Sequence, residues 1–80
     1  MNIREEVIKL TMDKFGVEET EITDSSRFID DLGGNDMDMI DFIFDLETKF
    51  NIEITEEEAE KLTTVGSVIK YLEKRGIKWK

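Results

Sequence analysis

The sequence predicts an all-α protein, a four-helix bundle with three main helices, one short helix and a long first loop. Apolar residues recur at helical spacing in three separate stretches, capping residues precede several of them, and no stretch alternates convincingly as a strand would. Eighty residues suffice for a single domain over 1–80, which would bury about 60% of the surface of the unfolded chain. Because Cys is absent, packed apolar faces must supply the stability.

The first helix is expected over about residues 2–15, and Gly16 ends it. Its apolar stripe consists of Ile3, Val7, Ile8, Leu10, Thr11 and Phe15. Residues 16–35 then lack sustained periodicity, and so long a loop is usually functional or held by its own side chains. The residues expected to hold it are Val17, Ile22, Phe28, Ile29 and Leu32. A turn at Gly33-Gly34 leads into the next helix.

The second helix, over about 36–50, carries two apolar strips. The core face consists of Met39, Phe42, Ile43, Leu46 and Phe50, which share one arc of about 100° on a helical wheel. Another strip, formed by Met37, Ile40 and Phe44, runs beside Asp38, Asp41 and Asp45. Exposed apolar residues rimmed by charge are typical of interaction surfaces. The pattern alone leaves two readings open, because this strip would be ordinary core if it packed beneath the long loop.

Two further helices follow. Thr55 and Glu58 have the spacing of a capping box, which predicts a short helix over about 56–61. Thr63 or Thr64 is expected to cap a last helix that runs to about Arg75 and ends at Gly76. The residues predicted to face inward are Val65, Val68, Ile69 and Leu72.

Charge is concentrated in the middle of the chain. Residues 18–60 carry sixteen acidic residues against Arg27 and Lys49, whereas residues 61–80 carry six basic residues and one acid. A surface this acidic repels phosphate backbones and attracts basic protein surfaces. Nucleic acid is therefore not expected as a ligand.

The sequence offers little for catalysis or for metal binding. His and Cys are absent, no Ser stands in a G-x-S-x-G turn, and the dense carboxylates are read as a solvated face. A calcium loop starting at Asp31 would place Phe42 where the last ligand belongs, and one starting at Asp36 fails as well. We therefore expect no enzyme activity and no specific metal site, although the acidic helix can bind divalent ions loosely.

The two ends of the chain suggest where the protein works. The N-terminal stretch is charged rather than signal-like and Cys is absent, so we expect a cytoplasmic protein. No apolar run reaches the roughly 18 residues that a membrane span needs. The basic tail over 74–80 contains Ile77 and Trp79, and we interpret it as a frayed solubilising end rather than a membrane or nucleic-acid contact.

A collinear set of residues resembles the acyl carrier protein family, whose members carry 4′-phosphopantetheine. The set runs without insertions through Phe28, Asp31-Leu32-Gly33, Asp38, Leu46-Glu47, Phe50, Ile54, EEAEK at 57–61, TTV at 63–65 and Tyr71. The resemblance implies a four-helix acyl carrier protein-like bundle, not itself an enzyme. Such a bundle docks its acidic second helix onto basic surfaces of fatty-acid or polyketide pathway enzymes, and its core can open for an acyl chain.

The resemblance also assigns roles to individual residues. The partner-binding positions it implies are Met37, Asp38, Ile40, Asp41, Phe44, Asp45 and Glu47 on the second helix, extended by Glu56 and Glu60 on the third. Family members have Asp-Ser-Leu at the start of the second helix, and that Ser carries the prosthetic group. This sequence reads Asn35-Asp36-Met37, so the resemblance puts Asp36 at the attachment position.

Asp36 makes attachment through this residue unfavourable. A carboxylate is a weaker nucleophile than an alcohol, it repels the diphosphate of coenzyme A, and its product would hydrolyse readily. We therefore expect no prosthetic group on this sequence.

Three functions stay open at this point. In each case we expect the protein to be a monomer. The first is a non-carrying scaffold, competitor or regulator of acyl-pathway enzymes. The second is an engineered or variant form of an ordinary carrier, and the third is an acidic decoy unrelated to acyl transfer.

Overall fold

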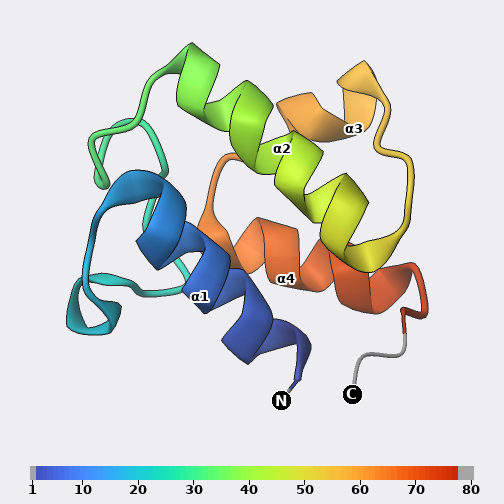
Figure 1. Cartoon of the computed structure of the whole chain (residues 1–80), viewed down its shortest axis with the longest axis horizontal. Coiled ribbons are helices and arrows are strands. Elements are labelled where there is room, and N and C mark those ends of the chain that lie inside the picture. The colour runs from blue at the N-terminus through green and yellow to red at the C-terminus, as the bar shows by residue number, and fades with distance from the viewer. Residues whose placement is uncertain (1, 78–80) are drawn as a thin grey trace.

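The computed structural model describes residues 2–77 and confirms the predicted helical bundle. Its elements follow in the order α1 (Ile3–Phe15), α2 (Asp36–Phe50), α3 (Glu56–Glu60) and α4 (Val65–Lys74). A 3₁₀ turn over Glu19–Glu21, which the sequence did not predict, interrupts the long first loop. In Figure 1, α1 and α4 lie beneath α2 and α3, and no strand is present among residues 2–77.

Local capping determines where the helices begin. Asn2 caps α1, Thr55 caps α3 and Thr64 caps α4, and in each case the residue three positions later completes a capping box. Gly16 ends α1 in the left-handed conformation, with φ of 66°. These local signals explain why the boundaries predicted from the sequence fall within one or two residues of the observed ones.

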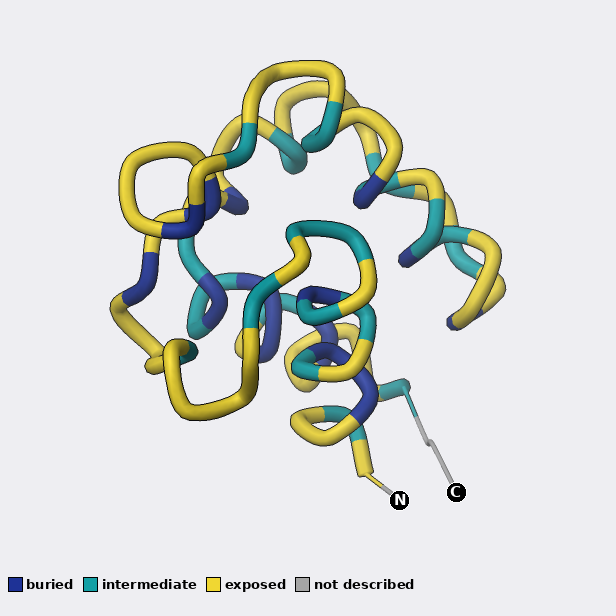
Figure 2. The backbone as a smooth tube through the Cα atoms, turned by 60° about the vertical axis from the view of Figure 1, so that its left-hand side comes forward, coloured by how far each residue is buried: buried dark blue, intermediate teal, exposed yellow. Residues whose placement is uncertain are grey.

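The core lies where α1, α2, α4 and the long loop meet, as the dark segments of Figure 2 show. Its buried apolar residues are Val7, Phe28, Leu32, Phe42, Leu46, Phe50, Leu62, Val65, Val68, Ile69 and Leu72. Phe15, Phe28 and Phe42 come from α1, the loop and α2, and their ring centroids lie 4.9–5.6 Å apart. This aromatic cluster joins the loop to both helices.

The long loop is held by α4 as well as by the core. The backbone carbonyls of Asp24 and Ser26 accept hydrogen bonds from the N–H groups of Gly66 and Val65, at 2.8 and 3.1 Å. These are two of the N–H groups that lack partners within a helix at its first turn. A Cβ on Gly66 would lie only 2.8 Å from the Asp24 carbonyl oxygen, so this contact requires glycine.

One predicted loop contact is wrong, because Ile29 is 46% exposed. Residues 27–32 form a tight turn in which Arg27 O accepts from the N–H groups of Asp31 and Leu32. In such a turn, side chains four positions apart lie on the same side. Phe28 and Leu32 therefore point inward together, and Ile29 points to solvent.

The expectation of a frayed tail from residue 74 is also wrong as far as residue 77. Arg75 donates hydrogen bonds to Glu53 O and to the Tyr71 hydroxyl, and Ile77 packs partly against the core. Trp79 and the lysines beside it lie outside the described residues. Among residues 2–77, no helix combines the length and apolar character that crossing a bilayer requires.

Candidate functional site

The start of α2 is a turn closed by a capping box. Asn35 is the N-cap: its side-chain oxygen accepts from Asp38 N–H at 2.9 Å, and the Asp38 carboxylate accepts from Asn35 N–H at 3.2 Å. The preceding Gly34 packs so closely on the Phe15 ring that a Cβ there would overlap it. Asp36 is therefore not the cap. It is the first residue inside the helix, and its side chain is exposed.

No alcohol side chain stands in this turn, because residues 33–40 contain neither Ser nor Thr. The serines elsewhere have structural roles. Ser26 is buried and accepts from Thr23 N–H, while Ser67 pairs with Thr64 in the capping box of α4. Ser25 lies in the same turn as Ser26, with its hydroxyl 3.2 Å from that of Thr23. The chemistry offered at the start of α2 is thus a carboxylate.

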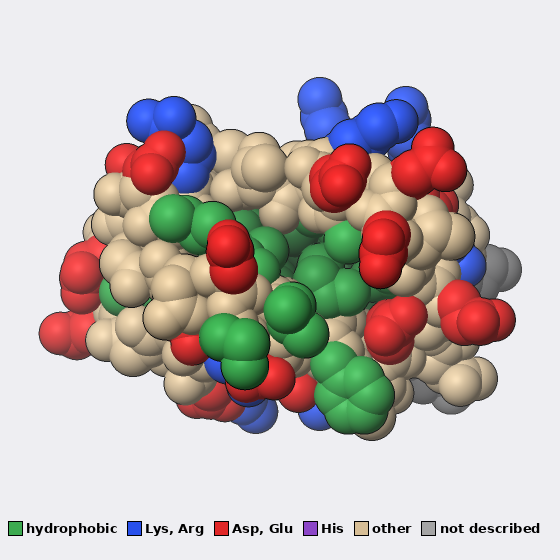
Figure 3. Space-filling model, turned by 90° about the horizontal axis from the view of Figure 1, so that it is seen from above, with side chains coloured by type: hydrophobic (Ala, Val, Ile, Leu, Met, Phe, Trp, Pro, Cys, Tyr) green, Lys and Arg blue, Asp and Glu red, His purple; other side chains and the backbone are tan. Residues whose placement is uncertain are grey.

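The second apolar strip of α2 is exposed, which settles the alternative that the sequence left open. Met37, Ile40 and Phe44 are 68%, 64% and 66% exposed. Figure 3 looks down on the face that carries α2 and α3, and there apolar side chains gather in a hollow with carboxylates around it. An exposed strip of this kind is a candidate interaction surface.

The acidic residues predicted to surround the strip fall into two groups. Asp41, Glu56 and Glu60 are exposed, and none of their side chains makes a hydrogen bond or ion pair within the described part of the chain. The others have intramolecular partners. Asp38 completes the α2 cap, Asp45 forms an ion pair with Lys14 at 3.2 Å, and Glu47 accepts from Ile54 N–H at 2.8 Å.

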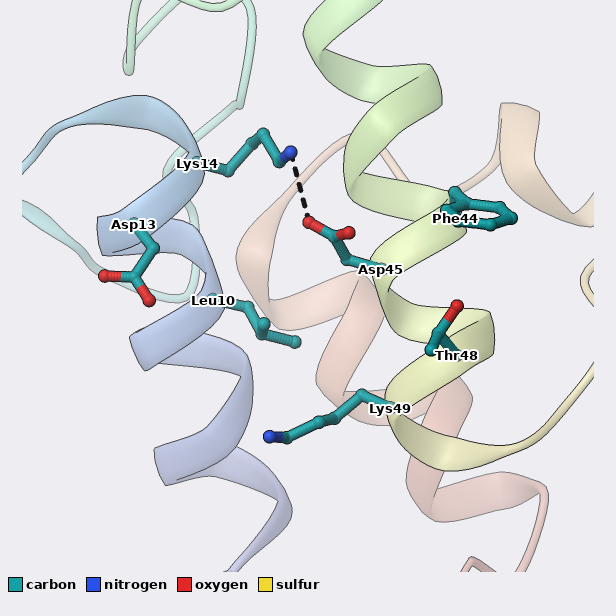
Figure 4. A pocket seen from close by; sticks show the side chains of 7 residues that line it. All are labelled: Leu10, Asp13, Lys14, Phe44, Asp45, Thr48 and Lys49. Atoms are coloured by element: carbon teal, nitrogen blue, oxygen red, sulfur yellow. Dashed lines mark ion pairs between the residues drawn. The ribbon is translucent and has the colours of Figure 1, made fainter.

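On the other side of α2, an open groove of about 540 Å³ separates it from α1. Its lining residues are Leu10, Asp13, Lys14, Phe44, Asp45, Thr48 and Lys49. In Figure 4 the Lys14–Asp45 ion pair spans the groove, whereas the Phe44 ring points away from α1. The groove is therefore lined by charged side chains and crossed by an ion pair, unlike the apolar strip.

The sequence did not indicate two of the residues that join α1 to α2. Lys49 forms an ion pair at 3.0 Å with Glu6, whose side chain is only 2% exposed. The signal was present, because Glu6 stands at helical spacing between Ile3 and Leu10 of the apolar stripe.

The carboxylates are dispersed rather than clustered. Within residues 2–77, no group of three or more acidic side chains is close enough together to hold a metal ion.

Fold and site together define a small helical carrier-type bundle with an exposed, acid-rimmed second helix. A family model described as a phosphopantetheine attachment site matches residues 5–72. The chain therefore belongs to the phosphopantetheine-attachment carrier family, in agreement with the resemblance noted from its residues. Domains of this family carry 4′-phosphopantetheine and interact with partner enzymes.

The residues at the start of α2 do not fit the group that the family carries. The resemblance puts the family's attachment serine in this turn, and the turn presents Asn35, Asp36 and Met37, with no hydroxyl. A carboxylate lacks the nucleophilicity of an alcohol and repels the incoming diphosphate.

Proposed function

We propose that this protein docks onto enzymes of fatty-acid or polyketide-type biosynthesis through α2 and does not itself carry 4′-phosphopantetheine. It would act there as a scaffold, competitor or regulator. One observation carries the proposal: α2 keeps an exposed apolar strip with free carboxylates, yet the turn at its start contains no hydroxyl.

The docking half of the proposal rests on exposure and charge. Met37, Ile40 and Phe44 are each about two-thirds exposed, although the same helix buries Phe42 completely. Free carboxylates at the rim favour a basic partner and accelerate its approach. They also disfavour a second copy of this chain, since two acidic rims would face each other, so we propose a monomer.

The other half of the proposal rests on the chemistry of Asp36, which we place at the attachment position of the family. A negative side chain in the first turn of a helix stabilises it by about 0.3–1 kcal/mol through the helix dipole. Asp36 would thus benefit the fold while it prevents loading. A protein of this kind has no catalytic role of its own, and we place it in the cytoplasm with the enzymes it would bind.

Intact mass after incubation with coenzyme A and a promiscuous phosphopantetheinyl transferase tests the proposal. The native chain is expected to keep its mass, whereas Asp36→Ser is expected to gain one phosphopantetheinyl group. Met37→Ser is a matched control, because it places a hydroxyl one residue further into the same helix, and it is expected to stay unmodified.

Each result has a defined meaning. Loading of the native chain would show that it is a working carrier and would overturn the non-carrying half of the proposal. If neither Asp36→Ser nor the native chain gains mass, and neither binds the transferase at low salt, the docking half fails as well.

A further inference from the structure

The peptide group between Glu53 and Ile54 lies in the linker between α2 and α3. Two charged side chains form hydrogen bonds with it. Its N–H, on Ile54, donates to the Glu47 carboxylate at 2.8 Å. Its C=O, on Glu53, accepts from the Arg75 guanidinium at 3.0 Å. Glu47 comes from α2 and Arg75 directly follows α4, so elements far apart in sequence meet at one peptide bond.

The position of this peptide matters because α3 has little else to hold it. The helix is only five residues long and has no buried residue. An isolated helix this short is not stable in water. Its apolar attachments are the partly buried Ile54 before it and the buried Leu62 after it.

Arg75 also reaches α3 itself. Its guanidinium lies 4.0 Å from the Glu58 carboxylate and donates to the Tyr71 hydroxyl at 2.8 Å. The N–H of Thr55, hydrogen-bonded to Glu58, lowers the pKa of that carboxyl, and the positive charge of Arg75 adds to the effect. Burial raises the pKa of the Tyr71 hydroxyl. Arg75 thus joins the linker, α3 and α4.

We propose that Glu47 and Arg75 act as a two-sided clamp on the Glu53–Ile54 peptide, and that the clamp sets where α3 presents Glu56 and Glu60 to a docking partner. Both are positioning residues in this proposal, and Glu47 does not contact the partner. The docking role of α3 rests on the proposed function, whereas the clamp itself is a property of the free protein.

Amide exchange of the free protein, followed by NMR, tests the clamp without any partner. Hydrogen bonds to charged groups are strong enough that Glu47→Gln or Arg75→Gln is expected to speed exchange about tenfold at Ile54 and Ala59. Amides of α1 are expected to stay unchanged. Asp13→Asn and Lys74→Gln are the controls, since they make the same charge changes at exposed residues that have no ion pair in residues 2–77. Unchanged exchange in both clamp variants would overturn the proposal.

Binding to the phosphopantetheinyl transferase then tests whether the clamp acts on docking. Arg75→Gln makes the protein more acidic, so charge alone predicts tighter binding to a basic partner. The clamp predicts the opposite, a loss of about three- to tenfold, because α3 no longer holds its carboxylates in place. Lys74→Gln changes the charge equally and is expected to bind as well as the native chain or slightly better. Arg75→Lys, which keeps the charge with fewer donors, is expected to be intermediate.

The outcomes separate this inference from the proposed function. Tighter binding by Arg75→Gln would overturn the role of the clamp in docking while leaving docking itself established. No binding by the native chain at low salt would overturn the proposed function, and the exchange result would still decide whether the clamp exists.

Discussion

The two sides of α2 are built from similar residues but arranged in opposite ways. On the inner side, Phe42 is fully buried and the charged residues beside it are paired, Asp45 with Lys14 and Lys49 with Glu6. On the outer side, Phe44 is 66% exposed and Asp41 has no partner within residues 2–77. Phenylalanine and aspartate are thus buried or ion-paired on the inner side of the helix and exposed without a partner in residues 2–77 on the outer side.

This difference teaches how one helix can serve both stability and binding. Burying an aromatic side chain and pairing a carboxylate lower the free energy of the folded chain. Leaving the same groups exposed contributes nothing to folding, so a partner can use them. Stability and binding should therefore respond to different residues of α2, and matched substitutions can test this.

The largest contrast is expected between the two phenylalanines of the helix. Phe42→Ala removes a ring packed between those of Phe15 and Phe28, and it is expected to lower the free energy of unfolding by about 3–5 kcal/mol. Phe44→Ala is expected to change it by no more than about 0.5 kcal/mol. Urea unfolding followed by circular dichroism measures both. Similar losses would show that the outer strip also supports the fold.

A smaller contrast is expected between the two lysines that pair with acids across α1 and α2. Lys49→Gln leaves the carboxylate of Glu6 buried without its ion pair, which is expected to cost about 1–3 kcal/mol of stability. Lys14→Gln breaks the more exposed pair with Asp45 and is expected to cost at most about 1 kcal/mol. The same urea titration compares them. Equal costs would mean that the burial of Glu6 does not make its ion pair more important.

The smallest effect is expected in docking affinity, when the removal of an unpaired carboxylate is compared with the removal of an ion-paired one. Asp41→Asn is expected to weaken binding to the transferase about two- to fivefold at low salt, as for other exposed charge pairs. Asp13→Asn, with the same charge change on α1, is expected to change binding less. The double variant Lys14→Gln/Asp45→Asn removes a paired carboxylate without changing net charge, and it is expected to bind as the native chain does. Titration calorimetry measures all three, and a loss of binding by the double variant would place Asp45 in the docking surface.

Most of the fold was predictable because its signals are local. The predicted capping residues Thr55 and Thr64 act on backbone groups three positions away, so they can be read from short windows of sequence. Exposure of Ile29 and burial of Glu6 were not predicted. Both depend on which side of a turn or helix meets another element, and hydrophobicity alone suggested the reverse in each case.

The candidate site was predictable as a region but not in the roles of its residues. The pattern of α2 indicated an acid-rimmed apolar strip, and the resemblance to carriers pointed to the same residues. Neither the pattern nor the resemblance indicated that Asp45 forms an ion pair with Lys14 or that the Glu47 carboxylate accepts a hydrogen bond from Ile54 N–H. The first contact joins residues 31 positions apart, and the second joins α2 to a residue beyond its end, so helical periodicity indicates neither of them.

By itself the sequence determined the helices, the caps of α3 and α4, the acidic centre of the chain and the absence of a hydroxyl at the start of α2. These follow from residue identity and from interactions within a few positions. Only the tertiary structure decided which carboxylates are free, that the outer strip stays exposed, and that Arg75 meets the linker before α3. The physical reason is that burial and ion pairing depend on what lies opposite a side chain, and the packing of distant elements determines that.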